Sequence, residues 1–226
     1  MNSVSFSARK RVVLSLAGLS AVSLALLALQ IYRTGSLGYA YLVWNLFLAW
    51  MPLLLSGIML RLLGKRLWTH WLLVLVSFVW LVMLPNSFYM ISDYIHIQEM
   101  PDNQLLYGIV MFTAFIFTAV LVGFSSLYIV HAELRKRLGH KTSSSLVAII
   151  LFACSFAIYL GRDLRWNSWD IIINPAGILF DVSDRVFHPL GHPGTISTTL
   201  TFFILLGSLY IVGWQLGEAT RETKRT

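Results

Sequence analysis

Long apolar runs separated by short polar connections leave this chain few folds other than a bundle of membrane-spanning helices. A helix needs roughly 20 apolar residues to cross the hydrocarbon core of a bilayer, and six runs are long enough. Only 12% of the residues are charged, whereas a soluble domain carries about a quarter. The sequence therefore predicts an all-α polytopic membrane protein, with a single domain over residues 1–226. Its six expected spans are residues 12–31, 39–62, 67–84, 105–130, 144–162 and 197–216.

The distribution of Lys and Arg predicts how these spans are oriented. Thirteen of the 17 basic residues lie in the N-terminal segment, the C-terminal segment and the connections at 61–66 and 131–143. Because short cytoplasmic loops of membrane proteins are enriched in Lys and Arg, we expect both termini in the cytoplasm and a multi-pass protein of the inner (plasma) membrane. The net charge of +7 then reflects topology. The lipid bilayer is the expected partner, and no nucleic-acid partner is expected.

A polar stretch follows the third apolar run directly, at the predicted outer boundary of the membrane. Ionisable groups near the bilayer are costly and are commonly functional. On an α-helix Asp93 and His96 are neighbours, and such a pair can form an acid/base unit or bind a metal. The alternative is the polar face of an interfacial helix that meets water. Four polar side chains share one narrow arc of this helix: Asn86, Tyr89, Asp93 and His96.

A second polar stretch begins at the end of the fifth run and contains Arg162 and Arg165. If the helix continues, both side chains share one face. Two arginines on the outer side oppose the charge bias and need a partner. The rigid fork of the guanidinium group suits phosphate and carboxylate, so an anionic ligand is one expectation. The alternative is an internal ion-pair network that fastens this span to the helix at 85–96.

Residues 174–188 predict a short amphipathic helix in the outer interface, with an asparagine as N-cap. His188 and His192 follow at a spacing that suits two metal ligands on a continuous helix. Prolines and a glycine around them argue against such a helix, which weakens the case for a metal pair. Together with two residues of the first polar stretch they form a candidate set for zinc: Asp93, His96, His188 and His192.

The two polar stretches resemble the two sequence blocks of an uncharacterised prokaryotic membrane family, domain of unknown function 1361 (DUF1361). The blocks read P-N-x-x-Y-x-x-S-D-x-x-H and R-x-x-R-W-N-S-W-D, and the likeness covers essentially the whole chain. Ser87 and Phe88 stand where the family pattern has Ala-Pro, which leaves the polar arc intact. The resemblance implies a polytopic membrane protein and no particular activity. It also implies a site of eight residues: Asn86, Tyr89, Asp93, His96, Arg162, Arg165, Asn167 and Asp170.

These residues favour a membrane enzyme that acts on a lipid or phosphate-bearing substrate. Asp93 and His96 would supply acid/base chemistry. Arg162 and Arg165 would hold an anionic group. No P-loop, zincin or serine-hydrolase motif occurs, and no apolar run holds an acid in its middle, which argues against a proton-coupled transporter. Two alternatives stay open: a carrier or binding module for a lipid or small anion, and a non-catalytic membrane scaffold.

Overall fold

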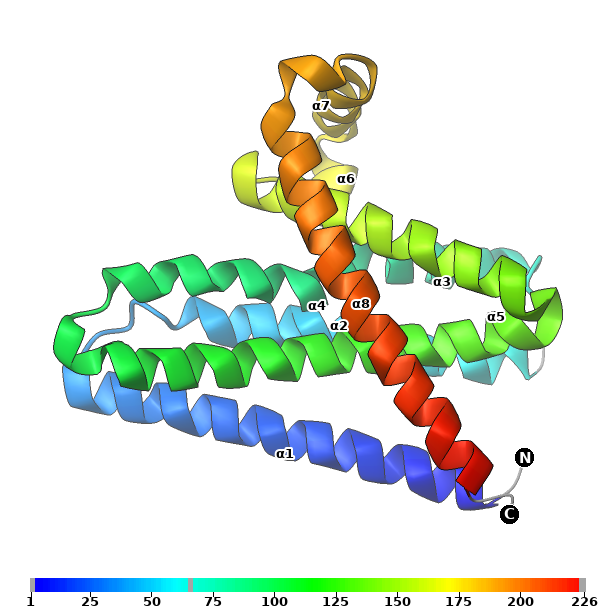
Figure 1. The fold of residues 1–226 in the computed structure, drawn as a ribbon, viewed down its shortest axis with the longest axis horizontal. Helices are drawn as coiled ribbons and strands as arrows, with labels where there is room; N and C mark the ends of the chain where they lie inside the picture. Colours follow the sequence, from blue (N-terminus) through cyan, green and yellow to red (C-terminus); the bar gives the residue numbers. More distant parts are fainter. Residues whose placement is uncertain (1–2, 65–66, 224–226) are drawn as a thin grey trace.

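Apolar helices make up most of the protein (Figure 1). The computed structural model describes residues 3–64 and 67–223, and over these ranges it contains helices and no strand, which confirms the predicted all-α class. Some basic residues that set the predicted orientation, such as Lys65 and Lys224, lie outside the described residues. In chain order the helices are α1 (Ser3–Thr34), α2 (Tyr41–Leu63), α3 (Trp71–Met83), α4 (Pro85–Tyr89), η1 (Met90–Glu99), η2 (Asp102–Gln104), α5 (Leu105–Asp163), α6 (Asp170–Ile173), α7 (Pro175–Phe187), η3 (Pro189–Gly191) and α8 (Pro193–Thr223).

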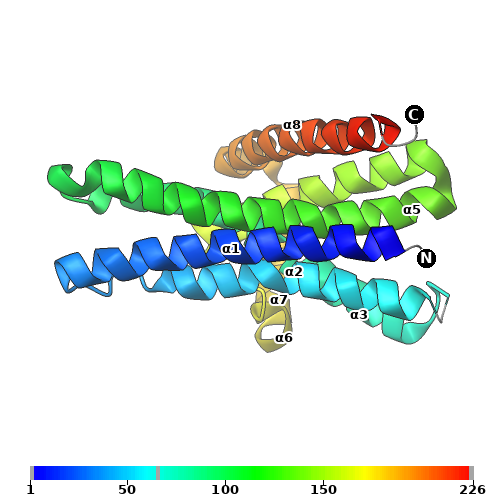
Figure 2. The same cartoon turned by 90° about the horizontal axis from the view of Figure 1, so that it is seen from below.

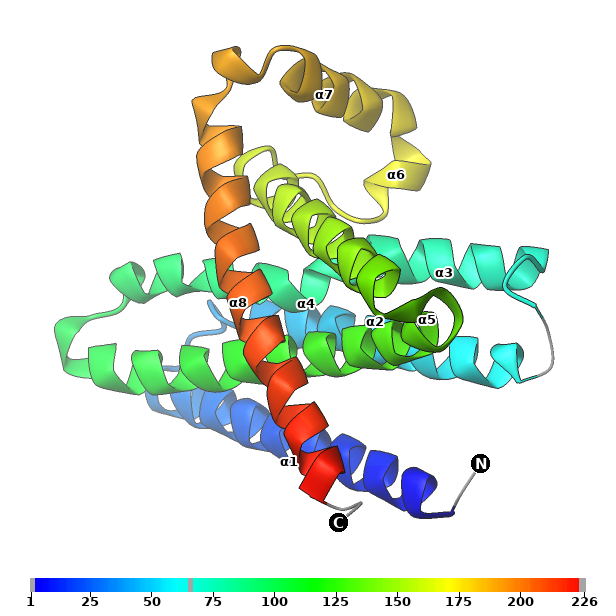
Figure 3. The ribbon, with the colours of Figure 1, turned by 45° about the vertical axis from the view of Figure 1, so that its right-hand side comes forward.

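Five of the described helical segments are long and apolar enough to cross a membrane. The fourth is 62 residues long and contains both the fourth and the fifth predicted runs. Gly139 breaks α5 with a backbone φ of +77°, a conformation that suits glycine because it has no Cβ. The two arms on either side of Gly139 fold back on one another (Figures 1 and 3). The five segments are Arg9–Thr34, Tyr41–Leu63, Trp71–Glu99, Asp102–Asp163 and Pro193–Thr220.

The first polar stretch continues the third helical segment instead of forming a separate helix beyond it. α3 begins at Trp71, where the side chain of His70 accepts a hydrogen bond from the Leu72 N–H (3.2 Å) and caps the helix. The helical path then runs through Pro85 into α4 and η1, so that Trp71–Glu99 is one candidate span. This segment differs from the predicted 67–84 at both ends. Proline is tolerated here because it occupies the first turn of α4, where its missing N–H would be unpaired.

Residues Met90–Glu99 form a 3₁₀ helix, whereas the sequence predicted an α-helix across the whole polar arc. The Ser92 hydroxyl donates a hydrogen bond to the Tyr89 carbonyl (2.7 Å) at the point where the winding tightens, and such side chains compete with the regular backbone ladder. Side chains three residues apart line up along one face of a 3₁₀ helix. Asp93, His96 and Glu99 therefore follow one another along η1.

The apolar back of this segment anchors it in the bundle. Phe88 and Met90 are fully buried and belong to the two main core clusters. A hydrogen bond joins α4 to α2: the Ser87 hydroxyl donates to the Ala49 carbonyl (2.8 Å). A Cβ on Gly123 would come within 2.6 Å of the Ser87 Cβ. α5 can therefore approach α4 this closely because residue 123 is a glycine.

The start of α1 and the end of α8 lie near one another at one end of the bundle (Figures 1 and 2). α6 and α7 lie beside the bundle, and in both views they are level with its middle instead of beyond its end. No residue of α6 or α7 is buried. These two short helices thus lie beside the candidate spans without being embedded among them.

Replacement of Gly123 by alanine is expected to lower the melting temperature of the detergent-solubilised protein. The added Cβ would overlap Ser87, and overpacking costs roughly 1–3 kcal/mol, which exceeds the gain in helix propensity of about 1 kcal/mol. Gly213→Ala in α8 is the matched control, because nothing lies within 4 Å of its added Cβ. Equal melting temperatures for the two variants would contradict the close packing of α4 on α5.

Candidate functional site

A cavity of about 440 Å³ lies between α2, the α3–η1 segment, the second arm of α5 and residues 166–178. Aromatic side chains form part of its wall, among them Trp44, Trp166 and Trp169. Its polar lining comes from three stretches that are distant in the sequence. The polar side chains are Tyr41 and Asn45 of α2, Asn86, Tyr89, Asp93 and His96 of α4 and η1, and Asn167 and Ser168 of the loop after α5.

Asp93 is the buried carboxylate of this cavity, with 2% of its surface exposed. Its Oδ2 accepts a hydrogen bond from the Asn45 amide (3.1 Å), which lies 48 positions earlier in the chain. A buried carboxylate is costly unless it is hydrogen-bonded, and Asn45 supplies the donor. Asp93 lies toward the end of the candidate span Trp71–Glu99 and not in its middle.

His96 is hydrogen-bonded to a carboxylate other than the one expected. Its Nδ1 lies 2.8 Å from Oε1 of Glu99, while among the described residues no hydrogen bond joins it to Asp93. The edge of the Tyr41 ring contacts the imidazole, with ring centroids 5.5 Å apart. A carboxylate at Nδ1 orients the ring and leaves Nε2 for a ligand. Glu99 was missed although its three-residue spacing from His96 equals that of Asp93.

Asn86 connects the two polar stretches. Its amide donates hydrogen bonds to the Met83 carbonyl (3.0 Å) and to the Ser168 hydroxyl (2.9 Å). Tyr89 lies against Gly161, where a Cβ would come within 3.2 Å of the tyrosine ring. The glycine therefore makes room for Tyr89 at the cavity wall. Ser168 was not predicted as a site residue, although it stands inside the second sequence block.

The two arginines do not share a helix face, contrary to the expectation. α5 ends at Asp163, and Arg165 adopts a left-handed conformation with a φ of +60°. The Trp166 N–H closes the helix end by donating to the Leu160 carbonyl (3.1 Å). Over residues 3–64 and 67–223, neither the Arg162 nor the Arg165 side chain forms a hydrogen bond or an ion pair. The described residues thus contain no direct ion pair through these arginines, although Arg162 lies near enough to Asp93 for its charge to act on that carboxylate.

Asp170 shapes the loop that carries the second block. Its Oδ2 accepts a hydrogen bond from the Asn167 N–H (2.7 Å), and this turn places Asn167 at the cavity. Of the eight residues implied by the family resemblance, the cavity is lined by Asn86, Tyr89, Asp93, His96 and Asn167. It is not lined by Arg162, Arg165 or Asp170.

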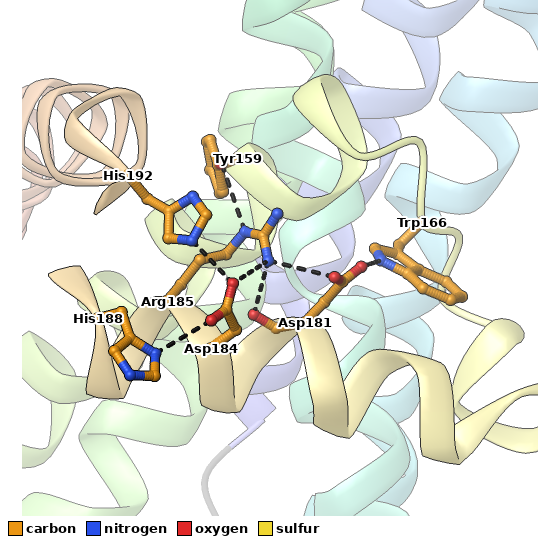
Figure 4. Close-up of polar contacts among 7 residues, drawn as sticks. All are labelled: Tyr159, Trp166, Asp181, Asp184, Arg185, His188 and His192. Carbon is orange, nitrogen blue, oxygen red and sulfur yellow. Dashed lines mark hydrogen bonds and ion pairs between the residues drawn. The ribbon is translucent and has the colours of Figure 1, made fainter. Parts of the chain in front are cut away.

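A second polar cluster attaches α7 to the rest of the protein (Figure 4). The Arg185 guanidinium forms an ion pair with Asp181 (3.2 Å) and donates a hydrogen bond to the Tyr159 hydroxyl of α5 (3.4 Å). The Trp166 indole N–H donates to the other oxygen of Asp181 (2.7 Å). The polar residues of α7 thus point toward the α5 end and the loop that lines the cavity.

The histidines that the sequence offered as zinc ligands bind Asp184 instead. His192 Nε2 lies 2.8 Å and His188 Nδ1 3.1 Å from the oxygens of this carboxylate. The hydrogen bond from His192, and to a smaller extent that from His188, lowers the pKa of Asp184. Burial acts in the opposite direction and does not outweigh them. In the part of the chain that the structure describes, no three His, Cys, Asp or Glu side chains are placed to hold a metal ion. The predicted set with Asp93 and His96 is therefore not brought together.

Comparison with known families adds the decisive observation on identity. A sequence profile of the family described as "Protein of unknown function (DUF1361)" matches residues 44–212. The chain belongs to the DUF1361 family. No curated protein and no solved structure matches it. The part of this DUF1361 protein that matches the family contains every residue of the cavity wall except Tyr41.

Asn45→Leu is expected to destabilise this DUF1361 protein by about 1–3 kcal/mol, because it leaves the buried Asp93 carboxylate without its donor. The measurement is thermal or chemical unfolding in detergent. In the double variant Asn45→Leu/Asp93→Leu both polar groups are removed, so the loss should be smaller than the sum of the two single losses. Additive losses would show that the two side chains do not interact.

The stability that Asp184 contributes is expected to disappear in acid. A carboxyl group whose pKa is lower in the folded than in the unfolded state stabilises the fold at pH values above its unfolded-state pKa of about 4. This contribution is lost as the pH falls through the pKa of the folded state. The wild type should therefore melt at a higher temperature than Asp184→Asn at neutral pH, and the difference should shrink below pH of about 4. A difference that is constant with pH would show that the charge of Asp184 is unimportant.

Proposed function

We propose that the protein is a membrane enzyme that binds a lipid or phosphate-bearing substrate in the polar cavity and uses His96 for acid/base catalysis. One observation carries the proposal: polar side chains from α2, from α4–η1 and from the loop after α5 converge on one cavity in an otherwise apolar bundle. Polar and ionisable groups inside membrane-spanning segments are costly and mark functional sites. A protein that served only as a scaffold could fill the same space with apolar side chains.

The proposed role of each group follows from its surroundings. His96, oriented by Glu99 at Nδ1, would exchange a proton with the substrate through Nε2. Asp93, held by Asn45, would stabilise positive charge that develops in the cavity. Asn86, with Tyr89 and Asn167, would offer neutral hydrogen-bonding groups to the substrate.

The arrangement in the membrane forms part of the same proposal. Each arm of α5 would be one crossing, which makes six spans, with both termini in the cytoplasm of the plasma membrane. α6 and α7 would lie against the lipid-facing flank of the bundle instead of at the outer interface that the sequence predicted. An even number of crossings agrees with the position of the start of α1 and the end of α8 at one end of the bundle (Figure 1). The cavity would then face the outer half of the bilayer.

A carrier or binding module for a lipid or small anion is the second candidate. The observation that favours it is the lack of any hydrogen bond or ion pair at the side chains of Arg162 and Arg165 within the described residues. Both arginines lie in the segment that follows Gly161 of the cavity wall, so either could hold an anionic group without turnover.

The test uses the full-length protein in lipid nanodiscs, incubated with a total polar lipid extract and a pool of phosphorylated metabolites. Consumption and product formation are followed by mass spectrometry. His96→Ala should lower product formation by about 10²–10⁴-fold, the usual contribution of a general acid/base. The control is His140→Ala, an exposed histidine of α5 outside the cavity.

Glu99→Gln serves as a positioning variant and should shift the pH dependence of the rate, since it changes the hydrogen bond at Nδ1. Equal product formation by wild type and His96→Ala would overturn the enzyme proposal. Retention of an unchanged lipid or phosphate compound by the wild type, without any product, would favour the binding module. Elemental analysis of the same preparation tests the zinc prediction.

A further inference from the structure

The apolar and polar faces of α7 are reversed relative to those of a helix that packs on a bundle in water. Its large apolar side chains point away from the protein, including Phe180 and Phe187, which is 77% exposed. Leu190 in η3, which follows α7, is 93% exposed. A contiguous apolar surface of this kind marks contact with a membrane or with another protein.

The polar face of α7 is turned inward. Only 10% of the Arg185 side chain is exposed, and the residue is held by Asp181 and by Tyr159 of α5 (Figure 4). Asp181 in turn binds Trp166, whose ring lines the cavity. Asp184 and His188, at the end of the helix, are 35% and 74% exposed and bind one another. A helix that turns most of its polar groups toward the protein and its apolar face outward is matched to hydrocarbon along that apolar face.

The position of α7 agrees with this assignment. α6 and α7 lie alongside α1, α2 and α3, level with the middle of these helices and next to the start of α8 (Figures 1 and 2). The spans themselves expose large apolar side chains, such as Trp44 on α2 and Phe78 on α3. The apolar face of α7 therefore continues the lipid-facing surface of the bundle.

Both short helices contribute to the wall of the cavity. Ile171 of α6 and Ile178 of α7 form part of its wall. Trp44 also lines the cavity and is 52% exposed on a candidate span. The apolar lining therefore includes a side chain on the outer surface of the spans, while Asp93 and His96 supply polar groups.

We propose that the ligand of this cavity is an amphiphile with a lipid tail and that it enters sideways from the bilayer, beneath α6 and α7. Its headgroup lies toward Asp93 and His96, and its acyl chain runs along Trp44 and Ile178 to the lipid. The inference concerns the same cavity as the proposed function and narrows its substrate class. This proposal excludes a soluble phosphate compound as the ligand, because such a compound needs no apolar wall.

The test places the full-length protein in nanodiscs that contain phosphatidic acid with a diazirine group in one acyl chain. After irradiation, labelled peptides are located by mass spectrometry. The cavity wall around Trp44 and Ile178 is expected to be labelled more strongly than the exposed apolar residues of α1. Excess unlabelled phosphatidic acid should suppress this labelling, and excess glycerol 3-phosphate should not.

Two neighbouring substitutions on α7 provide a matched pair. Ile178→Trp adds bulk to the cavity wall and should reduce the labelling around Trp44 several-fold. Leu179→Trp adds the same bulk to the exposed apolar face and should leave the labelling unchanged. Equal effects of the two variants, or labelling no stronger than that of α1, would overturn lateral access.

The outcomes separate this inference from the proposed function. If glycerol 3-phosphate is turned over by the wild type and not by His96→Ala, while the cavity is not labelled by the lipid, the enzyme proposal holds and the lipid-tailed ligand is rejected. If the cavity is labelled as expected and His96→Ala does not alter any turnover, the lipid site holds and the enzyme proposal is rejected.

Discussion

The hydrogen bond between Asn45 and Asp93 is the contact on which the cavity depends. A carboxylate that is 2% exposed inside a candidate span is tolerated only where a donor reaches it. That donor comes from α2, so α2 must pack against the end of the third helical segment. Once these two elements are fixed, the 3₁₀ winding of η1 presents His96 and Glu99 on the same side. One buried polar pair thus determines where the other polar groups of the cavity stand.

The same requirement explains the unusual direction of α7. Its charged residues satisfy one another, and they satisfy Tyr159 and Trp166 on the side that faces the protein. Its apolar residues are left to the surroundings. In water this arrangement would be unfavourable, whereas beside membrane-spanning helices it leaves no buried charge unpaired on this helix and exposes hydrocarbon to hydrocarbon. The cover of the cavity and the lipid-facing surface of the bundle are consequently continuous.

Local sequence patterns predicted the helices and much of the polar arc, because hydropathy and residue spacing report on one element at a time. They identified Asn86, Tyr89, Asp93 and His96, all of which line the cavity. They could not show that Asn45 binds Asp93, since that contact joins residues 48 positions apart. They placed the end of the fifth span at 162, next to the observed end of α5 at Asp163, but they could not decide whether the helix continues; it does not, and the two arginines are not aligned. Spacing also could not show that His188 and His192 bind Asp184, a residue of their own segment, and do not lie with Asp93 and His96.

The central claim is that the two polar sequence blocks form one site inside the membrane domain, and the contact between Asn86 and Ser168 tests it most directly. Their side chains lie 2.9 Å apart although 82 positions separate them. Cysteines are introduced at both positions after the single native cysteine, the buried Cys154, is replaced by alanine. Mild oxidation in native membranes should join Asn86→Cys to Ser168→Cys and protect both thiols from a maleimide reagent, whereas either single variant should stay reactive. Two thiols that both remain open to the reagent after oxidation would contradict the account.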